Sequence, residues 1–217
     1  MWEVVNLIPT QEEWYSVLCE RHGEECQKRF SSATVAVCGL GGLGSNIATI
    51  LARAGVGKLL LVDFDKVDIS NLHRQQYKAH QIGMNKTDAL KENILEIAPY
   101  ITLEINSVRI TQENAIELLE KADIICEAFD DAECKAMLAN LVLEKLPEKF
   151  LVAASGMAGM GSANTIKTRR VLKKLYICGD EESDVQTKGS LVSSRVMICA
   201  AHQAHTVLRI LTQQFET

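Results

Sequence analysis

Short apolar runs alternate with longer segments of mixed polarity along residues 1–155. The runs are rich in Val, Ile, Leu and Ala, as is typical of strands that are buried on both faces of a sheet. The predicted strands are residues 33–38, 58–62, 101–106, 123–127 and 150–154. The predicted helices are residues 11–29, 42–54, 85–98, 111–121 and 132–146. This alternation predicts a Rossmann-like α/β fold, with a doubly wound and mostly parallel sheet.

The rhythm changes after residue 155. Residues 162–178 form one or two extended segments, and these would add antiparallel strands to the sheet. Residues 179–189 are polar and acidic, which predicts a mobile loop. Residues 193–213 have helical periodicity, and the apolar face comprises Val196, Cys199, Ala200, Val207, Leu208 and Leu211. We therefore expect a C-terminal extension that ends in a long helix.

Composition narrows the class of protein. The chain has 217 residues and a net charge of −5, which disfavours a nucleic-acid binder. Its seven cysteines form no Cys-x-x-Cys pair, so we expect neither a disulfide framework nor a zinc site. The chain shows no signal peptide and no apolar stretch of about 18 residues. A cytoplasmic protein without a membrane segment is the expectation.

A glycine-rich turn follows the first predicted strand and opens the next helix. Its sequence, Gly-Leu-Gly-Gly-Leu-Gly, places glycines at Gly39, Gly41, Gly42 and Gly44. Glycines let the backbone approach an anion, and the start of a helix presents free N–H groups to it. The turn therefore predicts a phosphate-binding loop, although a tight turn without a ligand would have the same pattern.

A dense polar string follows the second predicted strand at residues 63–75, Asp-Phe-Asp-Lys-Val-Asp-Ile-Ser-Asn-Leu-His-Arg-Gln. An acid at the end of this strand, here Asp63, commonly binds ribose hydroxyls. Arg74 can grip phosphate oxygens with two N–H groups. A surface loop in which Ser70 and Asn71 cap a helix is the plain structural alternative.

The topology predicts where these groups meet. In a sheet of strand order 3-2-1-4-5 the crevice opens between strands 1 and 4 at their carboxyl ends. The glycine loop follows strand 1 and Asp130 follows strand 4, so we expect them to face one pocket. Glu127, Asp130 and Asp131 carry the oxygen ligands that Mg²⁺ prefers beside a triphosphate. One of the two adjacent aspartates is also expected to cap the next helix.

These motifs together resemble the MoeB/ThiF/E1 superfamily of adenylating enzymes. The resemblance combines Gly-x-Gly-Gly-Leu-Gly, the string Asp-x-Asp-x-Val-x-x-Ser-Asn-Leu-x-Arg-Gln, Lys86 and Asp130, and covers residues 30–155. Residues 151–161 and 198–204 further resemble the short, second-family ThiF proteins of thiamine (thiazole) biosynthesis. The match implies one E1-like adenylation domain over residues 1–217. Its parts are an N-terminal helical extension (1–30), a nucleotide-binding core (31–155), and an extension with a crossover loop and C-terminal helix (156–217).

The resemblance also implies roles for individual residues. Gly42 would lie against the triphosphate of ATP and Asp63 would hold the ribose. Arg74, Lys86 and Asp130 would carry catalysis, with Asp130 positioning Mg²⁺. The nucleotide-binding set that we expect comprises Gly39, Gly41, Gly42, Gly44, Asp63, Asp65, Ser70, Asn71, Arg74, Gln75, Lys86 and Asp131.

The implied reaction is ATP-dependent adenylation of the C-terminal Gly-Gly carboxylate of a ubiquitin-like sulfur carrier protein. It would form an acyl-adenylate and pyrophosphate, and a sulfur donor protein would act later. A homodimer is implied, with Arg21 or Arg29 of one subunit completing the other's site. Residues 179–194 lack the cysteine of many family members, so we expect no thioester step on this chain, and Cys178 is expected to be a packing residue.

Four other functions fit parts of the sequence. A related enzyme could activate a molybdopterin sulfur carrier, and a non-catalytic relative could only dock a carrier. An NAD-dependent oxidoreductase would share the glycine loop and Asp63, but has no use for the Ser-Asn-Leu-x-Arg-Gln string. A tRNA-modifying enzyme would adenylate a small carboxylate, and the acidic charge weighs against it. His202 and His205 are expected to be hydrogen-bonded helix residues, with a metal pair as the less favoured reading. Met157 and Met160 are expected either to pack or to approach the carrier tail.

Overall fold

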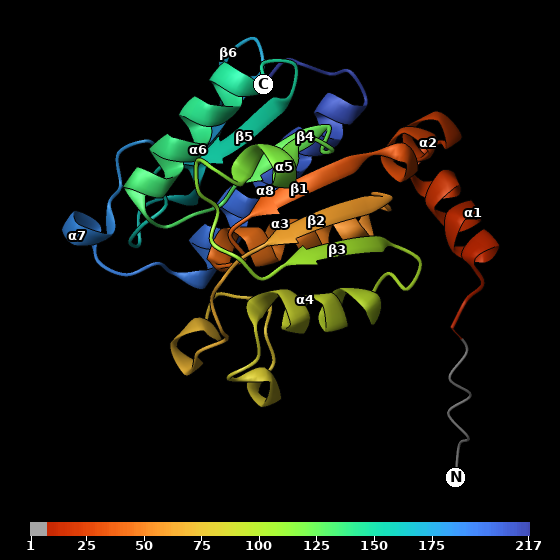
Figure 1. The fold of residues 1–217 in the computed structure, drawn as a ribbon, viewed down its shortest axis with the longest axis horizontal. Helices are drawn as coiled ribbons and strands as arrows, with labels where there is room; N and C mark the ends of the chain where they lie inside the picture. The colour runs from red at the N-terminus through yellow and green to blue at the C-terminus, as the bar shows by residue number, and fades with distance from the viewer. Residues whose placement is uncertain (1–7) are drawn as a thin grey trace.

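The computed structural model describes residues 8–217, and within them seven strands form one twisted sheet (Figure 1). The strand order is β3-β2-β1-β4-β5-β7-β6, and every neighbouring pair is parallel except β6 with β7. The strands are β1 Thr34–Cys38, β2 Lys58–Val62, β3 Thr102–Asn106, β4 Ile124–Glu127, β5 Phe150–Ala154, β6 Lys167–Leu172 and β7 Leu175–Gly179. The predicted fold class, including the strand order 3-2-1-4-5, is confirmed.

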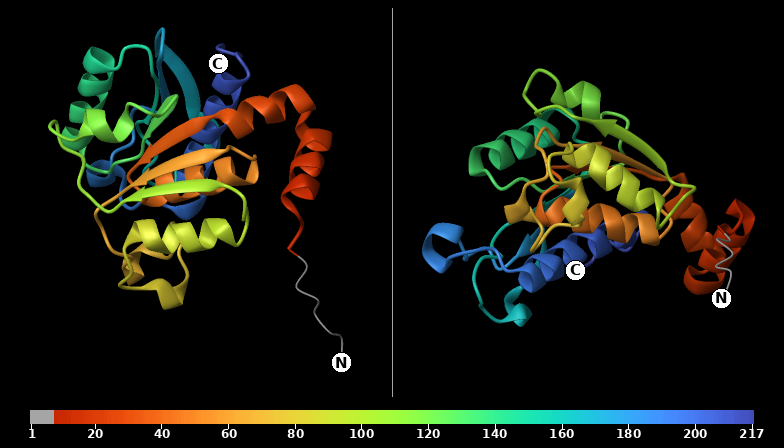
Figure 2. Two further views of the ribbon diagram at one scale, coloured as in Figure 1. Left: turned by 45° about the vertical axis from the view of Figure 1, so that its right-hand side comes forward. Right: turned by 90° about the horizontal axis from the view of Figure 1, so that it is seen from below.

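Helices cover both faces of this sheet (Figure 2). Helices α3, α4 and α8 pack on one face, where the core includes Val35, Leu59 and Val152. Helices α5 and α6 pack on the other, where the core includes Ala36 and Leu60. The helices are α1 Gln11–His22, α2 Glu24–Ser32, α3 Gly42–Arg53, α4 Lys86–Leu95, α5 Ala115–Leu119, α6 Ala132–Lys145, α7 Val185–Lys188 and α8 Ser193–Leu211. Three short 3-10 helices are η1 Ile69–Asn71, η2 Ala79–Gln81 and η3 Ala163–Thr165.

Cover on both faces explains the sequence pattern of the central strands. Successive side chains of a strand point to opposite faces, so a strand between two helical layers needs apolar residues at every position. The last four residues of β1 and of β2 are all buried. At the edge of the sheet, β6 carries a mixture of exposed and half-buried residues instead, consistent with its charged sequence.

The N-terminal helical segment differs from the prediction of one helix over residues 11–29. Gly23 has a φ of +86°, which breaks the segment into α1 and α2. Glycine adopts this left-handed conformation without a steric penalty, so the chain can turn there. The predicted capping box of Thr10 and Glu13 is present at the start of α1.

Three further boundaries differ from the prediction. Helix α5 is shorter than the predicted 111–121, because Asn114 occupies the N-cap position and its Oδ1 accepts the Thr111 N–H. Helix α4 ends at Leu95, before the predicted residue 98, and Asn85 at its N-cap position donates to the Asp88 carboxylate. The polar segment 179–189 contains the one-turn helix α7. The extended residues 162–178 do form the antiparallel pair β6 and β7, as the second of the two alternatives proposed.

The crevice of this fold lies where the strand order reverses, between β1 and β4. Strands β1 and β4 are neighbours, and their connections leave toward opposite edges of the sheet. The carboxyl ends of these strands therefore border the crevice expected for a doubly wound fold. None of the helices in residues 8–217 has the length and apolar content needed to cross a bilayer.

Candidate functional site

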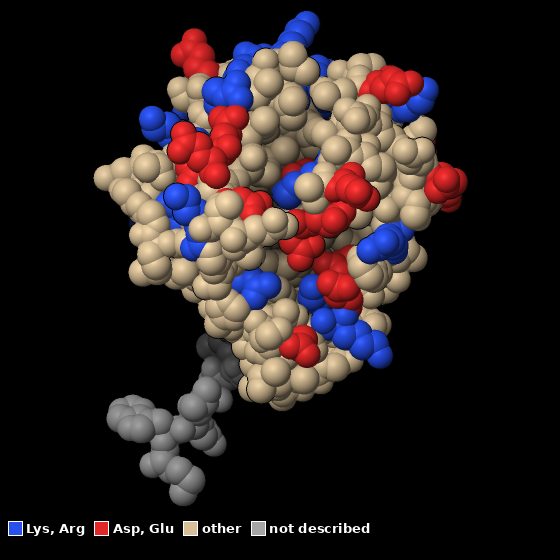
Figure 3. All heavy atoms as spheres, turned by 90° about the vertical axis from the view of Figure 1, so that its left-hand side faces the viewer, with Lys and Arg blue, Asp and Glu red and all other residues tan. Residues whose placement is uncertain are grey.

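A cavity of about 320 Å³ lies at the carboxyl ends of the central strands, within the size range of small-molecule sites. Figure 3 looks onto this edge of the sheet and shows the hollow with acidic and basic side chains around it. The predicted site residues that line this crevice are Gly39, Gly41, Gly42, Asp63, Asp65, Asn71, Arg74, Gln75, Lys86, Asp130 and Asp131.

The glycine loop owes its shape to close backbone contacts. Gly39 has a φ of +88°, and a Cβ there would lie 2.9 Å from the Ala128 carbonyl oxygen. A Cβ on Gly44 would lie 1.8 Å from the Gly39 carbonyl oxygen. Tyr77 Oη donates to the Leu40 carbonyl at 2.7 Å and holds the loop from below. Gly44 is therefore required by the fold and does not itself line the crevice.

Gly41 is different because no atom of residues 8–217 comes closer than 3.8 Å to the place that a Cβ would take there. Its φ is −74°, and the nearest atom to a Cβ there would be Gln75 Nε2 at 3.8 Å. Gly41 is the N-cap of α3, and within the described part of the chain no side chain caps the free N–H groups of that helix. An uncapped helix start beside open space is a suitable anion site, since the N–H groups and the helix dipole both favour negative charge.

Asp63 links the end of β2 to the glycine loop. Its Oδ2 accepts the Leu40 N–H at 2.6 Å, and its Oδ1 accepts the Asp65 N–H at 2.8 Å. Asp63 is buried and each carboxylate oxygen retains a second lone pair for a ligand. This position at the crevice wall suits hydrogen bonds to ribose hydroxyls.

Lys86 brings a buried positive charge to the same crevice. The Lys86 side chain is only 7% exposed, and its Nζ lies 2.8 Å from Asp65 Oδ2. Asp65 is half exposed, so the ion pair opens toward the cavity. A buried ammonium with one exposed partner can exchange that partner for a phosphate oxygen at small desolvation cost.

The polar string after β2 folds into η1 and two turns that carry Arg74 and Gln75 to the crevice. Asp68 and Asn71 form a capping box around η1, which explains the spacing of this string. Arg74 Nη1 donates to the Ser70 carbonyl at 3.1 Å, while the buried Arg74 Nε and Gln75 Oε1 have no partner among the described residues. Buried polar atoms without partners are rare, so these two indicate a ligand or ordered water.

Three acidic residues, one at the end of β4 and two just after it, have different environments. Asp131 caps α6, where its Oδ1 accepts the Cys134 N–H at 2.8 Å, and this backbone hydrogen bond lowers the pKa of Asp131. Asp130 is exposed and lines the cavity. Glu127 was expected beside a metal, but it is buried and paired with Lys135 Nζ at 2.9 Å outside the lining of the crevice. Burial raises the pKa of Glu127, against the pull of Lys135.

The residues present fit a magnesium ion held jointly with a triphosphate. Mg²⁺ usually takes one or two protein carboxylates and completes its shell with water and phosphate oxygens. Asp130 is a carboxylate in the crevice that makes no hydrogen bond with the described residues, and Asp131 is next to it. Within residues 8–217 no group of three or more His, Cys, Asp or Glu residues is arranged to hold a metal alone.

Several predicted residues lie elsewhere. Ser70 is exposed outside the crevice lining and donates to Asp68 Oδ1 at 2.6 Å; the N-cap of η1 is Asp68, so Ser70 does not cap a helix as the structural alternative proposed. His202 is half-buried and bonded to Thr168 Oγ1 at 2.9 Å, as expected, whereas His205 is exposed. Cys178 is buried among packing partners, also as expected.

The two methionines predicted either to pack or to approach the carrier tail differ in burial. Met157 is buried at the crevice wall, whereas Met160 is 85% exposed. The tract between them therefore passes from the crevice to the surface.

Two further residues of the crevice lining, Arg109 and Phe64, had no role in the sequence-based prediction. Arg109 follows β3 and its guanidinium lies 4.7 Å from the centre of the Phe64 ring, and both residues line the cavity. Phe64 was within the quoted string and is half exposed. An exposed aromatic residue directly after Asp63 was the available signal, but the partner arginine is distant in sequence.

The structure therefore defines a doubly wound α/β protein whose crevice joins an anion-binding glycine loop to acidic and basic side chains. The particular family follows from sequence comparison. A model of the ThiF family matches residues 15–217, and the chain belongs to that family.

Individual relatives show the same relationship. The chain is 38% identical over 110 residues to the sulfur carrier protein adenylyltransferase of Thermus thermophilus, covering 50% of this chain and 41% of that protein. It is 34% identical over 143 residues to the adenylyltransferase and sulfurtransferase MOCS3 of Caenorhabditis briggsae, covering 65% of this chain and 35% of that protein. The matches thus span about two-fifths or less of these relatives' length.

Solved structures share the fold. The E. coli tRNA N6-threonylcarbamoyladenosine dehydratase TcdA, in complex with ATP, superposes with a TM-score of 0.85 and 19% identity, covering 96% of this chain and 98% of that chain. E. coli MccB with ATP superposes with a TM-score of 0.71 and 20% identity, covering 95% of this chain and 66% of that chain.

Proposed function

We propose that this protein catalyses ATP-dependent adenylation of the C-terminal Gly-Gly carboxylate of a ubiquitin-like sulfur carrier protein. The proposal rests on the residues that line one crevice. The opening at Gly41, the buried Lys86, the unpartnered Arg74 Nε and the exposed Asp130 all line it. This set supplies an anion cradle, two cations and a metal-binding carboxylate, which is what transfer of an adenylyl group requires.

The chemistry needs no general base. A terminal carboxylate is ionised at pH 7 and is already a nucleophile. Its oxygen attacks the α-phosphorus of ATP, the bond from that phosphorus to the pyrophosphate oxygen breaks, and an acyl-adenylate and pyrophosphate result. The protein contributes by aligning the two substrates and by neutralising the charge that moves onto pyrophosphate.

Each crevice residue has a place in this scheme. The N-terminus of α3 at Gly41 and Gly42 receives phosphate oxygens, and Asp63 receives the ribose hydroxyls. Arg74 and Lys86 neutralise the departing pyrophosphate. Magnesium, held through Asp130, would screen the phosphate charges.

The identity of the carrier protein is a second element of the proposal. A sulfur carrier is supported by the named activity of the Thermus thermophilus relative, which shares 38% of aligned residues. A role in thiamine biosynthesis rests on the resemblance of residues 151–161 and 198–204 to short ThiF proteins. Conversion of the activated carboxyl to a thiocarboxylate would then need a separate sulfur donor.

We also propose a homodimer in which an arginine crosses between subunits. Arg29 forms an ion pair with Glu25 of its own helix at 3.1 Å, whereas Arg21 is exposed in the last turn of α1. Arg21 is therefore the better candidate to reach a neighbouring site.

A small carboxylate carried on tRNA is the second candidate substrate. It is suggested by the fold likeness to TcdA over nearly the whole of both chains. The same adenylation step would apply, so the two candidates differ only in the molecule that brings the carboxylate.

The test is ATP–pyrophosphate exchange with Mg²⁺ in the presence of a Gly-Gly-tailed carrier from the same genome. We expect exchange that depends on the carrier and disappears when the last glycine of the carrier is removed. Exchange that instead requires tRNA would favour the second candidate. ATP binding without exchange in either case would contradict an adenylating function and leave a docking protein.

A further inference from the structure

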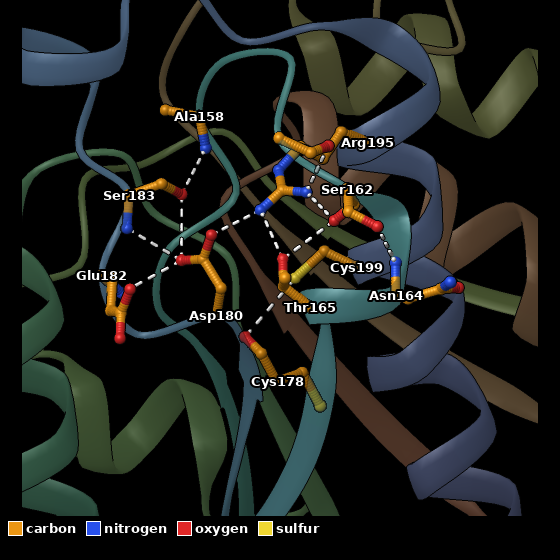
Figure 4. Close-up of polar contacts among 11 residues, drawn as sticks. Ala158, Ser162, Asn164, Thr165, Cys178, Asp180, Glu182, Ser183, Arg195 and Cys199 are labelled. Atoms are coloured by element: carbon orange, nitrogen blue, oxygen red, sulfur yellow. Dashed lines mark hydrogen bonds and ion pairs between the residues drawn. The ribbon is translucent and has the colours of Figure 1, made fainter.

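A buried ion pair joins three segments of the C-terminal third, and the scheme above gives it no role. Arg195 lies near the start of α8 with a side chain that is 5% exposed, and it pairs with the 12% exposed Asp180 just after β7 (Figure 4). The same guanidinium donates to the carbonyls of Gly161 and Ser162 and to Thr165 Oγ1 at 3.1 Å. One side chain thus holds α8, the segment after β7 and the tract after β5 together.

Asp180 extends this arrangement through its second oxygen. Its Oδ1 accepts the N–H groups of Glu182 at 3.0 Å and Ser183 at 2.8 Å, and the Ser183 hydroxyl at 3.0 Å. The Ser183 oxygen in turn accepts the Ala158 N–H at 2.9 Å. Figure 4 shows this continuous chain of contacts from Arg195 through Asp180 and Ser183 to Ala158.

This series of hydrogen bonds reaches the wall of the crevice at Ala158. Ala158 and Ser183 both line the cavity that holds the glycine loop. The backbone supports the same connection, since the Asp180 N–H donates to the Gly156 carbonyl at 2.9 Å. A Cβ on Gly156 would lie 2.1 Å from Asp180 Oδ1, so the two segments approach as closely as glycine permits.

This wall differs chemically from the side that suits phosphates. The cations of the crevice come from residues before 136, namely Arg74, Lys86, Arg109 and Lys135. The lining residues from the C-terminal third are Gly156, Met157, Ala158, Ser183, Asp184, Val185, Leu191 and Val196. With small or apolar side chains and one acid, this wall suits an uncharged, narrow segment of a second substrate better than it suits ATP.

A buried ion pair is also a poor source of stability, because desolvation offsets most of its attraction. Its directional contacts are better suited to holding several loop segments in one arrangement. We propose that Arg195, Asp180 and Ser183 form a positioning chain that fixes the crevice wall at residues 156–158 and 183–185 for the carboxylate substrate and leaves ATP binding unaffected. This inference rests on the proposed adenylation only for the identity of that substrate.

Ser183→Ala is the sharpest test because it breaks the chain between Asp180 and Ala158 and keeps the buried ion pair. Loss of one or two hydrogen bonds predicts a rise of about fivefold to tenfold in KM for the carrier in pyrophosphate exchange. KM for ATP and the thermal midpoint should stay close to those of the wild type. Ser183→Thr retains the hydroxyl and should restore the carrier KM, and Ser194→Ala, an exposed neighbour, is the matched control.

Amide hydrogen exchange provides a readout that needs no carrier. In Ser183→Ala we expect faster exchange in residues 156–159 and 180–185, with the glycine loop unchanged. Unchanged exchange in those segments would overturn the proposal, and so would an equal rise of both KM values. If the wild type shows no carrier-dependent exchange of pyrophosphate, the proposed function fails. In that case the positioning role is tested by amide exchange and ATP affinity alone: faster exchange in Ser183→Ala with an unchanged affinity for ATP would support it.

Discussion

Two alanine substitutions in one glycine loop should have opposite consequences. A Cβ on Gly44 meets the carbonyl oxygen of Gly39 at 1.8 Å, whereas a Cβ on Gly41 meets nothing closer than 3.8 Å. Gly44→Ala therefore places a methyl group inside the backbone of the loop. Gly41→Ala places one in the open part of the crevice.

The structure sets the expected magnitudes. Relieving the contact at Gly44 requires a shift of more than 1 Å, since nonbonded atoms approach to about 3.5 Å. The atom in the way belongs to the backbone, so we expect a loss of about 3 kcal/mol or more in the free energy of unfolding. At Gly41 the nearest atom to an added Cβ is 3.8 Å away, so the free energy of unfolding should change by no more than about 1 kcal/mol.

For ATP affinity, we expect a loss from the substitution that leaves stability nearly unchanged. In Gly41→Ala the added methyl group occupies space that we assign to phosphate, so ATP affinity should fall by about tenfold or more, equivalent to roughly 1.4 kcal/mol. Urea unfolding and calorimetric titration with ATP measure both quantities on the same samples. Normal ATP affinity in a stable Gly41→Ala protein would refute the placement of the triphosphate. A stable Gly44→Ala protein would refute the loop geometry.

Further substitutions test the other parts of the site. Asp130→Ala should leave the unfolding midpoint unchanged and reduce adenylation by on the order of a hundredfold or more, measured by pyrophosphate exchange across magnesium concentrations; near-normal turnover would exclude the metal role. Burial raises the pKa of Asp180, but hydrogen bonds from Ser183, Glu182 and Arg195 outweigh it and hold the pKa below its usual range. The stability from this group is present above the pKa of the unfolded chain and is lost as pH falls through the lowered pKa. Urea unfolding should therefore show a weaker acid dependence in Asp180→Asn, and an identical pH profile would contradict the assignment. Gly42→Ala should destabilise through a contact of 2.9 Å with Val196, and thermal unfolding should show a smaller loss from Gly42→Ala in a Val196→Ala background than in the wild type.

The parts of the fold that the sequence predicted are those encoded locally. Apolar runs identified four of the five parallel core strands, and alternation of apolar and polar residues identified the strand at residues 101–106; the glycine loop and Asp63 marked the ends of the first two. Connection rules then supplied the strand order without any knowledge of contacts. Eleven of the predicted site residues line the crevice, and most of them lie just after a core strand or at the start of a helix, whereas Asn71, Arg74 and Gln75 reach it through the loop after β2.

The features that were not predicted depend on pairs of residues distant in sequence. No sequence motif near Arg195 indicates that it pairs with Asp180. Likewise, no motif near Glu127 shows whether it is a metal ligand or a buried partner of Lys135. Gly23 was compatible with a continuous helix, because a glycine inside a helical pattern costs only about 1 kcal/mol. The structure ends α1 at Gly23, and α2 beyond it buries Gln27 and Phe30, which lie far in sequence from most of the residues that cover them.

The central claim is that a carboxylate of a second substrate attacks the α-phosphate of ATP in this crevice. The most direct measurement uses ATP labelled on its α-phosphate or on its γ-phosphate, with the purified Gly-Gly carrier and Mg²⁺, followed by rapid acid quench. We expect that label from the α-phosphate alone becomes attached to the carrier, with release of pyrophosphate. Transfer of γ-label to the carrier, or release of inorganic phosphate without labelled carrier, would contradict it.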